Sequence, residues 1–181
     1  MSTITFKIVL LISIITSLHS ISYADESLPA PPVGIIKLQP IPSPQLVLTD
    51  IDGEKFSLDS LKGQWVFVHF WASWCGPCRK EMPAIQSMWR LLEKEGLKIA
   101  LINTAEDEDT IFSFVSVYAP DIRALMDKDG LATEKWKPRG LPATYLVDEK
   151  GLIQYQALGG RKWDTKTYLN FLRKLIDHSK K

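Results

Sequence analysis

The chain has 181 residues, of which 45% are hydrophobic and 24% charged, a balance typical of a folded domain and not of a disordered tail. Lys and Arg number 22 against 21 Asp and Glu, so no net charge favours nucleic acid or an anionic membrane as a partner. Two cysteines and three histidines exclude a disulfide-stapled mini-protein and a zinc ribbon held by four cysteines. One ordinary domain with a hydrophobic core is expected, which leaves both cysteines free for chemistry.

The first 24 residues have the order of a secretory signal peptide. Lys7 precedes a mostly apolar run over residues 8–18, and Ser22, Tyr23 and Ala24 form a small-x-small cleavage site. The run is shorter than the roughly 20 residues that a membrane-spanning helix needs. We therefore expect export, to the periplasm in a bacterium, with a soluble mature protein. The alternative is an uncleaved N-terminal anchor that tethers the protein to the inner membrane.

Residues 25–45 follow as a proline-rich leader. They hold more than half of the eleven prolines of the chain, namely Pro29, Pro31, Pro32, Pro40, Pro42 and Pro44. Proline lacks an N–H donor and disfavours helix, so an extended, polyproline-like segment is predicted. The folded domain is predicted to begin near Leu46 and to occupy residues 46–181.

Strands and helices alternate from Leu46 onward. Asp52 and Gly53 indicate a hairpin turn before the first long buried strand. Strands are predicted over residues 46–49, 55–58, 65–71, 97–103, 122–126, 143–147 and 152–157, with 122–126 as an edge strand. Helices are predicted over residues 75–95, 110–118, 131–136 and 165–176. This order predicts an α/β fold, a three-layer α/β/α sandwich around a mixed central sheet.

Both cysteines belong to one motif at the junction of the buried strand and the long helix, made of Trp74, Cys75, Gly76, Pro77 and Cys78. At a helix N-terminus, unpaired N–H groups and the helix dipole favour a thiolate at Cys75. Cys78 is close enough in sequence to close a small and reducible disulfide ring. A purely structural disulfide gains little from so short a loop, and a metal site would have only His69 as a further ligand. We therefore predict redox chemistry, with no metal and no other cofactor.

Two segments resemble the thioredoxin superfamily. Residues 70–79 are similar to its active-site segment, and residues 140–144, Gly-Leu-Pro-Ala-Thr, are similar to its cis-proline loop. The early hairpin and the extra helix between Asn103 and Asp127 resemble the exported TlpA/ResA/DsbE branch of thiol–disulfide oxidoreductases. The resemblance implies a thioredoxin fold with an N-terminal β-hairpin and an inserted helix.

The same resemblance implies roles for individual residues. Cys75 is the expected nucleophile and Cys78 the resolving thiol, together forming the redox-active disulfide. A cis Leu141–Pro142 bond is expected to face the pair, with neighbouring backbone groups binding a substrate segment. Trp74, Gly76 and Pro77 are expected to support the site.

His69 and Glu106 are the two candidates for acid–base help. His69 occupies the place where thioredoxins carry a buried Asp, and a neutral, hydrogen-bonded core histidine is the alternative. Glu106 follows a strand at a point where the ResA-like branch has an acid near its cysteines, and a solvated charge run over residues 106–109 is the alternative. We expect Glu106 to assist Cys78 more than His69 does, because burial disfavours a charged imidazolium.

The predicted function is exported thiol–disulfide exchange in the reducing direction. The Cys75 thiolate attacks a disulfide of a substrate protein, and Cys78 resolves the mixed disulfide. The resemblance implies apocytochrome c or metal-site cysteines as substrates and a membrane thiol–disulfide transporter as electron donor. An oxidant or isomerase that runs the same exchange in reverse, and a copper-handling binding module, are the alternatives.

Overall fold

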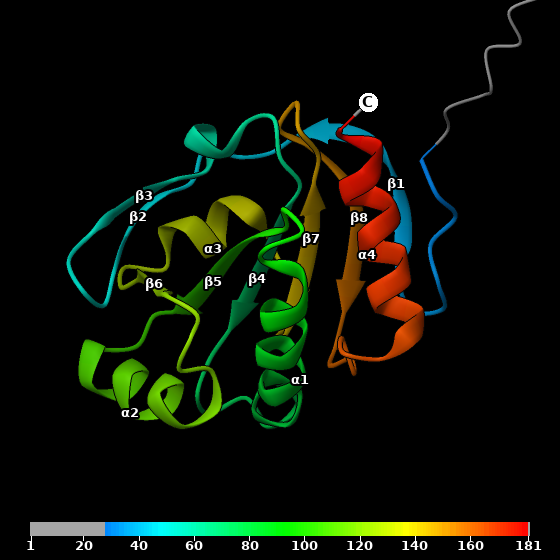
Figure 1. Ribbon diagram of the computed structural model, residues 1–181. Coiled ribbons are helices and arrows are strands. Elements are labelled where there is room, and N and C mark those ends of the chain that lie inside the picture. Colours follow the sequence, from blue (N-terminus) through cyan, green and yellow to red (C-terminus); the bar gives the residue numbers. More distant parts are fainter. Residues whose placement is uncertain (1–27, 181) are drawn as a thin grey trace, which may run out of the picture.

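The computed structural model describes residues 28–180 (Figure 1). Among these residues, eight strands form one mixed sheet in the order β1-β8-β7-β4-β5-β6-β2-β3. The strands are β1 (Ile36–Pro42), β2 (Val47–Asp50), β3 (Lys55–Ser57), β4 (Val66–Trp71), β5 (Lys98–Thr104), β6 (Ala124–Asp127), β7 (Ala143–Val147) and β8 (Leu152–Leu158). The helices are α1 (Gly76–Leu92), α2 (Glu108–Tyr118), α3 (Leu131–Trp136) and α4 (Lys166–His178), with a 3-10 turn, η1 (Leu58–Leu61).

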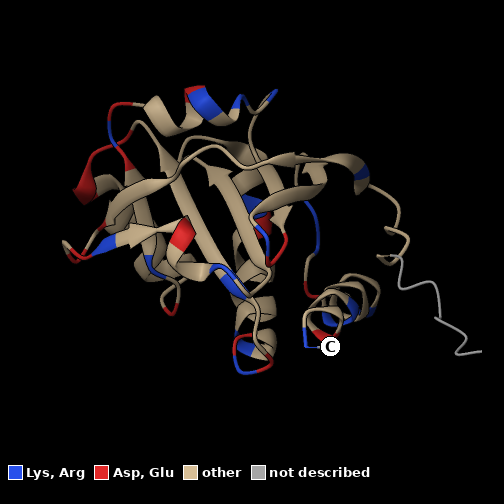
Figure 2. Ribbon diagram, turned by 90° about the horizontal axis from the view of Figure 1, so that it is seen from above, with Lys and Arg blue, Asp and Glu red and all other residues tan. Residues whose placement is uncertain are grey.

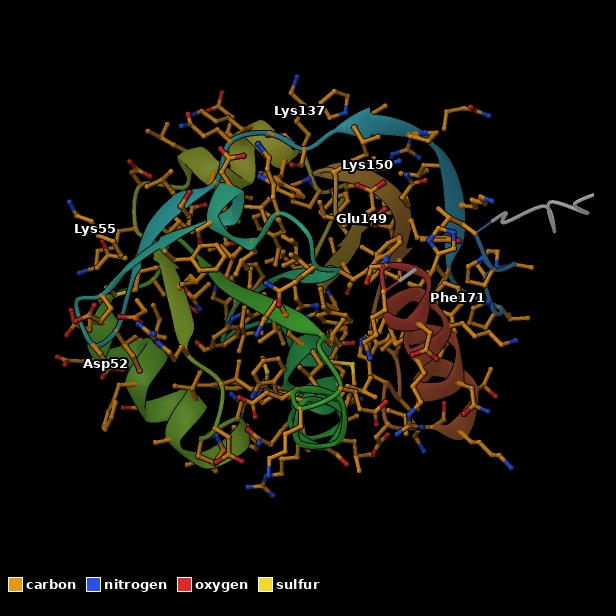
Figure 3. All side chains as sticks on the ribbon, turned by 45° about the horizontal axis from the view of Figure 1, so that its top comes forward. Asp52, Lys55, Lys137, Glu149, Lys150 and Phe171 are labelled. Atoms are coloured by element: carbon orange, nitrogen blue, oxygen red, sulfur yellow. A yellow bond between two sulfur atoms is a disulfide. The ribbon has the colours of Figure 1, made fainter. Side chains whose placement is uncertain are left out.

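The central strand β4 is buried along its whole length. It pairs in parallel with β5 and antiparallel with β7. Because side chains alternate along a strand, Phe67 and Trp71 belong to the core beneath α1, α2 and α4, whereas Val68 and Phe70 belong to the core beneath α3. Side chains fill the space between the sheet and the helices (Figure 3). The predicted three-layer α/β/α sandwich is confirmed.

The leader differs from its prediction. Ile36–Pro42 is extended, as predicted, but it is an edge strand paired antiparallel with β8 and not a polyproline-like segment. Tyr155 donates a hydrogen bond from Oη to the carbonyl of Pro29 at 2.7 Å, and Tyr168 does the same to Val33 at 3.0 Å. The folded unit therefore starts upstream of the predicted boundary at Leu46. An edge strand tolerates proline because one of its sides needs no N–H donor.

The strand predicted at the sheet edge over residues 122–126 lies inside the sheet. β6 is flanked by β5 on one side and by β2 on the other. The predicted hairpin around Asp52 and Gly53 is confirmed, and β3 forms the edge instead. Asp50 fixes this hairpin, since its Oδ1 accepts hydrogen bonds from the amides of Asp52 and Glu54 at 3.0 and 2.8 Å.

Charged residues of both signs lie on the loops and the helices, while the central strands are mostly uncharged (Figure 2). Within residues 28–180, the helices are all too short or too polar to cross a bilayer. The predicted signal peptide over residues 1–24 lies outside the described part of the chain, so export stays a prediction.

Candidate active site

Cys75 and Cys78 form a disulfide at the start of α1, with their Cα atoms 5.2 Å apart. Cys75 is the N-cap residue of the helix, and its Sγ accepts a hydrogen bond from the amide of Cys78 at 3.3 Å. Pro77 is placed in the first turn, where its missing N–H leaves no helical bond unmade. Cys75 keeps 5% of its surface exposed and Cys78 none. A reagent from solvent therefore meets Cys75 first.

The peptide bond between Leu141 and Pro142 is cis, as the resemblance implies. Pro142 directly precedes β7, and the pairing of Ala143 with Phe70 brings it to the end of β4 that leads into the cysteine motif. The indole of Trp74 beside Cys75 is 70% exposed. The cis-proline, the cysteines and this tryptophan therefore gather at one end of the sheet.

Glu106 is held against the loop that precedes Cys75. Its Oε2 accepts hydrogen bonds from the amide of Ser73 at 2.7 Å and from Asn103 Nδ2 at 2.6 Å, and its Oε1 accepts one from Ser73 Oγ at 2.5 Å. Ala105, with φ of +57°, turns the chain after β5 through the left-handed region. The carboxylate therefore fixes Ser73, and its partners among the described residues do not include either cysteine.

The rest of the acidic run behaves differently. Asp107 is the N-cap of α2, and its carboxylate accepts a hydrogen bond from the amide of Thr110 at 2.8 Å. This bond, together with one from the Thr110 hydroxyl, lowers the pKa of Asp107. The alternative of a solvated N-cap cluster thus describes Asp107, while Glu106 binds Ser73 and Asn103.

His69 is fully buried, and it faces α1 together with Phe67 and Trp71. Its Nδ1 lies 2.9 Å from Thr144 Oγ1, and its Nε2 lies 3.3 Å from Oε1 of Glu81. The hydrogen-bonded core histidine considered above therefore has a second, ionisable neighbour. Glu81 is buried as well, one helical turn after Cys78.

Glu81 was not among the site residues predicted from the sequence. The signal was present, since Cys78, Met82 and Ile85 are spaced as the buried face of a helix and Glu81 falls three residues after Cys78, within that face. A charged side chain in a buried helix face is rarely there without a partner.

The loop after β8 closes over Glu81. The amide of Arg161 donates a hydrogen bond to Glu81 Oε2 at 2.7 Å. Gly160 lies so close to the first turn of α1 that a Cβ atom there would be 3.2 Å from the carbonyl oxygen of Pro77. A hollow of about 390 Å³ opens here, lined by Pro77, Lys80, Glu81, Gly160, Arg161 and Lys162. One side of the Glu81 carboxylate thus faces His69 and the other faces this hollow.

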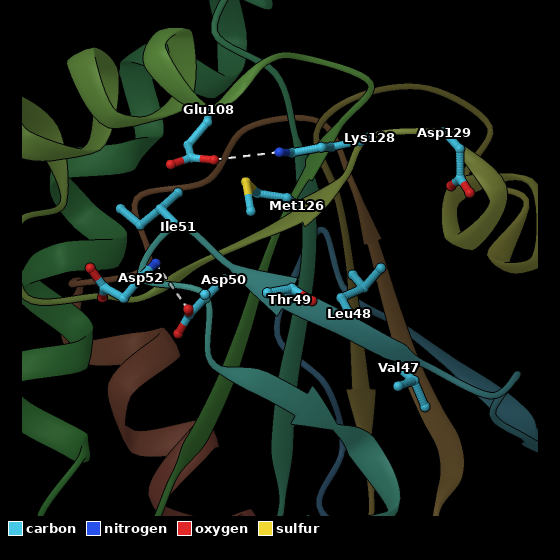
Figure 4. Close-up of a pocket in the computed structure, with 11 residues that line it drawn as sticks. Val47, Leu48, Thr49, Asp50, Ile51, Asp52, Glu108, Met126, Lys128 and Asp129 are labelled. Atoms are coloured by element: carbon cyan, nitrogen blue, oxygen red, sulfur yellow. Dashed lines mark hydrogen bonds and ion pairs between the residues drawn. The ribbon is translucent and has the colours of Figure 1, made fainter.

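A larger hollow lies elsewhere. It measures about 700 Å³ and is lined by β2, the turn after it and Met126 of β6, with Lys128 and Glu108 3.4 Å apart at its rim (Figure 4). It includes no residue of the cysteine motif or of the cis-proline loop. Within residues 28–180, His, Cys, Asp and Glu do not gather in threes as a metal site would require. The chemistry is therefore sought at the cysteines.

A disulfide at a helix N-terminus beside a cis-proline loop, on this sheet, defines a thioredoxin-fold protein with a dithiol/disulfide site. The profile of the AhpC/TSA family matches residues 40–156, and the chain belongs to this family.

Named relatives agree with this assignment. The chain is 30% identical over 111 residues to the thiol-disulfide oxidoreductase ResA of Bacillus subtilis. The matched segment covers 61% of this chain and 62% of that protein. It is 32% identical over 117 residues to ResA of Bacillus thuringiensis, covering 65% and 68%. The chain thus spans a little under two thirds of the first relative and a little over two thirds of the second.

Solved structures confirm the fold. The thioredoxin domain of a thiol-disulfide oxidoreductase from Bacteroides vulgatus superposes with a TM-score of 0.65 at 25% identity, covering 76% of this chain and 99% of that one. The predicted resemblance to the ResA-like branch and the predicted thioredoxin fold are both confirmed.

Proposed function

We propose that this protein is an exported thiol–disulfide oxidoreductase that reduces disulfides of substrate proteins through Cys75 and Cys78. The observation that carries the proposal is the disulfide at the N-terminus of α1, next to the cis Leu141–Pro142 bond. The names of the relatives support the reaction class.

In the reduced protein, the Cys75 thiolate is the attacking group. The amide of Cys78 already donates to its sulfur, and the helix N-terminus adds a favourable dipole. Attack on a substrate disulfide joins Cys75 Sγ to one substrate sulfur and releases the other as a thiolate. The Cys78 sulfur then loses its proton and attacks Cys75 Sγ, which releases the second substrate thiolate and re-forms the Cys75–Cys78 disulfide.

The other site residues position the substrate and the loop. In this mechanism the backbone at Leu141 and Pro142 binds a substrate segment, and the exposed side chain of Trp74 adds an apolar contact. Gly76 and Pro77 allow a tight helix start. Glu106 holds Ser73 and thereby the residues just before Cys75. Acid–base help from Glu106 to Cys78 stays a prediction, beside which Glu81 is a second carboxylate that lies one turn from Cys78.

The direction of the reaction is set by the redox potential of the pair. The Gly-Pro dipeptide between the cysteines is thioredoxin-like, so a potential closer to about −270 mV than to the roughly −120 mV of the oxidant DsbA is expected. Equilibration of the protein with defined glutathione or dithiothreitol buffers measures it. A potential above that of protein disulfide isomerase, about −180 mV, would favour the oxidant or isomerase reading.

Substrates of the kind implied by the resemblance are apocytochrome c and metal-site cysteines, with a membrane thiol–disulfide transporter as the electron donor and the periplasm as the compartment. The Cys78→Ala protein stalls at the mixed disulfide and captures its partners in cells. We expect cysteine-containing exported proteins in the captured set, and none with the matched Cys75→Ser, Cys78→Ala control. Capture of cytoplasmic proteins alone would contradict export.

A further inference from the structure

Two ionisable side chains are buried between α1 and the sheet, beside the dithiol. The side chain of His69 is completely buried, and that of Glu81 is 3% exposed. His69 Nε2 and Glu81 Oε1 lie 3.3 Å apart as an ion-pair contact, and neither atom has a hydrogen-bond partner among the described residues. Buried polar atoms without partners are rare in folded proteins, so the close approach of these two atoms calls for an explanation.

This pair is the middle of a chain of four groups. Thr144 lies directly opposite His69 in the pairing of β7 with β4, and its hydroxyl is 2.9 Å from Nδ1. At the other end, the amide of Arg161 donates to Glu81 Oε2 at 2.7 Å. If the Thr144 hydroxyl donates to Nδ1, then Nε2 carries the imidazole proton and donates it toward Glu81. Each of the two gaps around the imidazole then holds one proton.

The surroundings hold the imidazole in place. Phe67 stacks on His69 with ring centroids 5.8 Å apart, and the edge of Trp163 packs against Phe67 at 4.8 Å. Glu81 follows Cys78 by three residues on α1, so the two side chains are neighbours on the face that meets the sheet. Two groups therefore set the position of the Glu81 carboxylate relative to Cys78, the imidazole of His69 beside Oε1 and the amide of Arg161 at Oε2.

We propose that His69 is a positioning residue, whose Nε2–H holds the Glu81 carboxylate beside Cys78 and ties it, through Thr144, to the strand that begins after cis-Pro142. The inference rests on the proposed function, because it concerns how the mixed disulfide is resolved. The Cys78 thiol proton passes to the Glu81 carboxylate, Cys78 Sγ bonds to Cys75 Sγ, and the bond from Cys75 to the substrate sulfur breaks with release of a thiolate. The proton then leaves Glu81 through the hollow at residues 160–162.

The ionisable groups around Glu81 come from three elements. They are His69 of β4, Cys78 and Lys80 of α1, and Arg161 and Lys162 of the loop after β8. Lys80 and Lys162 line the outer side of the hollow and are exposed. The hollow therefore opens to solvent between two exposed amines.

The test compares two replacements of His69 that keep different halves of the imidazole. His69→Gln places an amide N–H near the position of Nε2 and cannot become charged, whereas His69→Asn keeps a polar group near Nδ1 and loses the donor to Glu81. The measurement is the rate at which a fluorescent peptide is released from a preformed mixed disulfide at Cys75, as a function of pH. The alkylation rate of Cys75 in the reduced protein reports the first half-reaction separately.

We expect His69→Asn to slow peptide release by roughly tenfold at neutral pH and to shift its pH profile upward, with alkylation of Cys75 unchanged. His69→Gln restores the rate to within about threefold of the parent. Glu81→Gln slows release at least as much as His69→Asn, and the double variant is no slower than Glu81→Gln alone, because both act through one group.

Three outcomes would overturn the inference. The first is that His69→Asn releases the peptide at the parental rate, and the second is that His69→Gln slows release as much as His69→Asn does. The third is that the slowing in the double variant equals the combined slowing of the two single variants. If His69→Asn does not fold, Thr144→Val and Thr144→Ser replace it, with slower release expected only for the variant that lacks the hydroxyl. Failure of the proposed function is separate, since the parent protein itself would then release no peptide.

Discussion

The two faces of β4 differ although both are fully buried. Toward α1, the strand presents His69 between Phe67 and Trp71, and this face meets the buried carboxylate of Glu81. Toward α3, it presents Phe70 among aromatic rings, with the Trp136 and Tyr145 centroids 5.6 and 6.1 Å away. The first face contains ionisable groups beside the dithiol, and the second contains apolar packing.

The α3 face of β4 therefore contributes mainly to the stability of the fold, and the α1 face lies beside the reacting cysteines. On the α3 face, the polar group of Tyr145 is used to bind the carbonyl of Trp136 at 3.1 Å, at the end of α3. On the α1 face, buried polar groups face one another across α1, β4 and β7 and end at a hollow near solvent. Changes on the α3 face should therefore lower the free energy of unfolding without altering thiol exchange. Changes at His69 or Glu81 should alter thiol exchange and affect the free energy of unfolding less.

The largest expected effect is on the α3 face. Phe70→Ala removes a fully buried ring and should lower the free energy of unfolding by about 3–5 kcal/mol, as measured by urea denaturation of the oxidised protein. The redox potential of the folded variant should stay at the parental value. Phe70→Leu is the matched control and should cost less. A shifted potential in folded Phe70→Ala would show that the two faces are not independent.

A smaller effect is expected from breaking the buried pair. His69→Leu removes the imidazole that lies 3.3 Å from Glu81 Oε1 and leaves this buried oxygen against an apolar group, which should cost about 1–3 kcal/mol of stability. His69→Leu combined with Glu81→Leu should cost less than the sum of the two single changes, because no unpaired charge then stays buried. Urea denaturation of the four proteins completes the cycle. Simple additivity would mean that the two side chains do not interact.

Tyrosines on the two faces predict a loss of stability in alkali. Burial raises the pKa of Tyr155 from 10.0 to about 12, and burial likewise raises that of Tyr145. The unfolded chain therefore releases these protons at lower pH than the folded protein, so stability is intact below pH 10 and falls as the pH rises toward 12.

Replacing each tyrosine by phenylalanine measures how much each face contributes to this loss of stability in alkali. Tyr155→Phe should remove about 1.4 kcal/mol of the decline between pH 9 and 11, because about one unit of the pKa shift is expressed by pH 11. It should also remove the bond to Pro29, worth about 0.5–1.5 kcal/mol. Tyr145→Phe is the matched change on the α3 face. Urea midpoints at pH 9 and 11 measure both. An undiminished decline in Tyr155→Phe would contradict the assignment.

The smallest effect is expected outside both faces, where Arg173 of α4 binds Glu95 beyond the end of α1 with bonds of 2.9–3.1 Å. Hydrogen bonding from Arg173 lowers the pKa of Glu95. The contribution is present above the ordinary carboxyl pKa of 4.5 and is lost as the pH falls below it. The pair is over a third exposed, so Arg173→Ala should cost at most about 1 kcal/mol and less in high salt. A larger, salt-insensitive loss would contradict this.

The sequence by itself determined the features that depend on neighbouring residues. Alternation, helical spacing and turn residues placed the hairpin at Asp52 and Gly53, the buried strand β4 and the helix that begins after Cys75, because each of these signals is read over a few consecutive positions. The motif at residues 74–78 located the reacting sulfurs for the same reason. The cis-proline was placed by resemblance, since cis is the minority form of such bonds.

Only the tertiary structure decided which distant residues meet. The pairing of β1 with β8 moved the start of the domain ahead of Leu46, and the added hairpin placed β6 inside the sheet. Glu106 is hydrogen-bonded to Ser73, 33 positions away in the sequence, and His69 to Thr144, 75 positions away. Such contacts depend on strand order and register, which bring together groups that no local pattern connects. Glu81 acquired its significance in the same way, because a buried carboxylate is interpretable only once its partner on β4 is known.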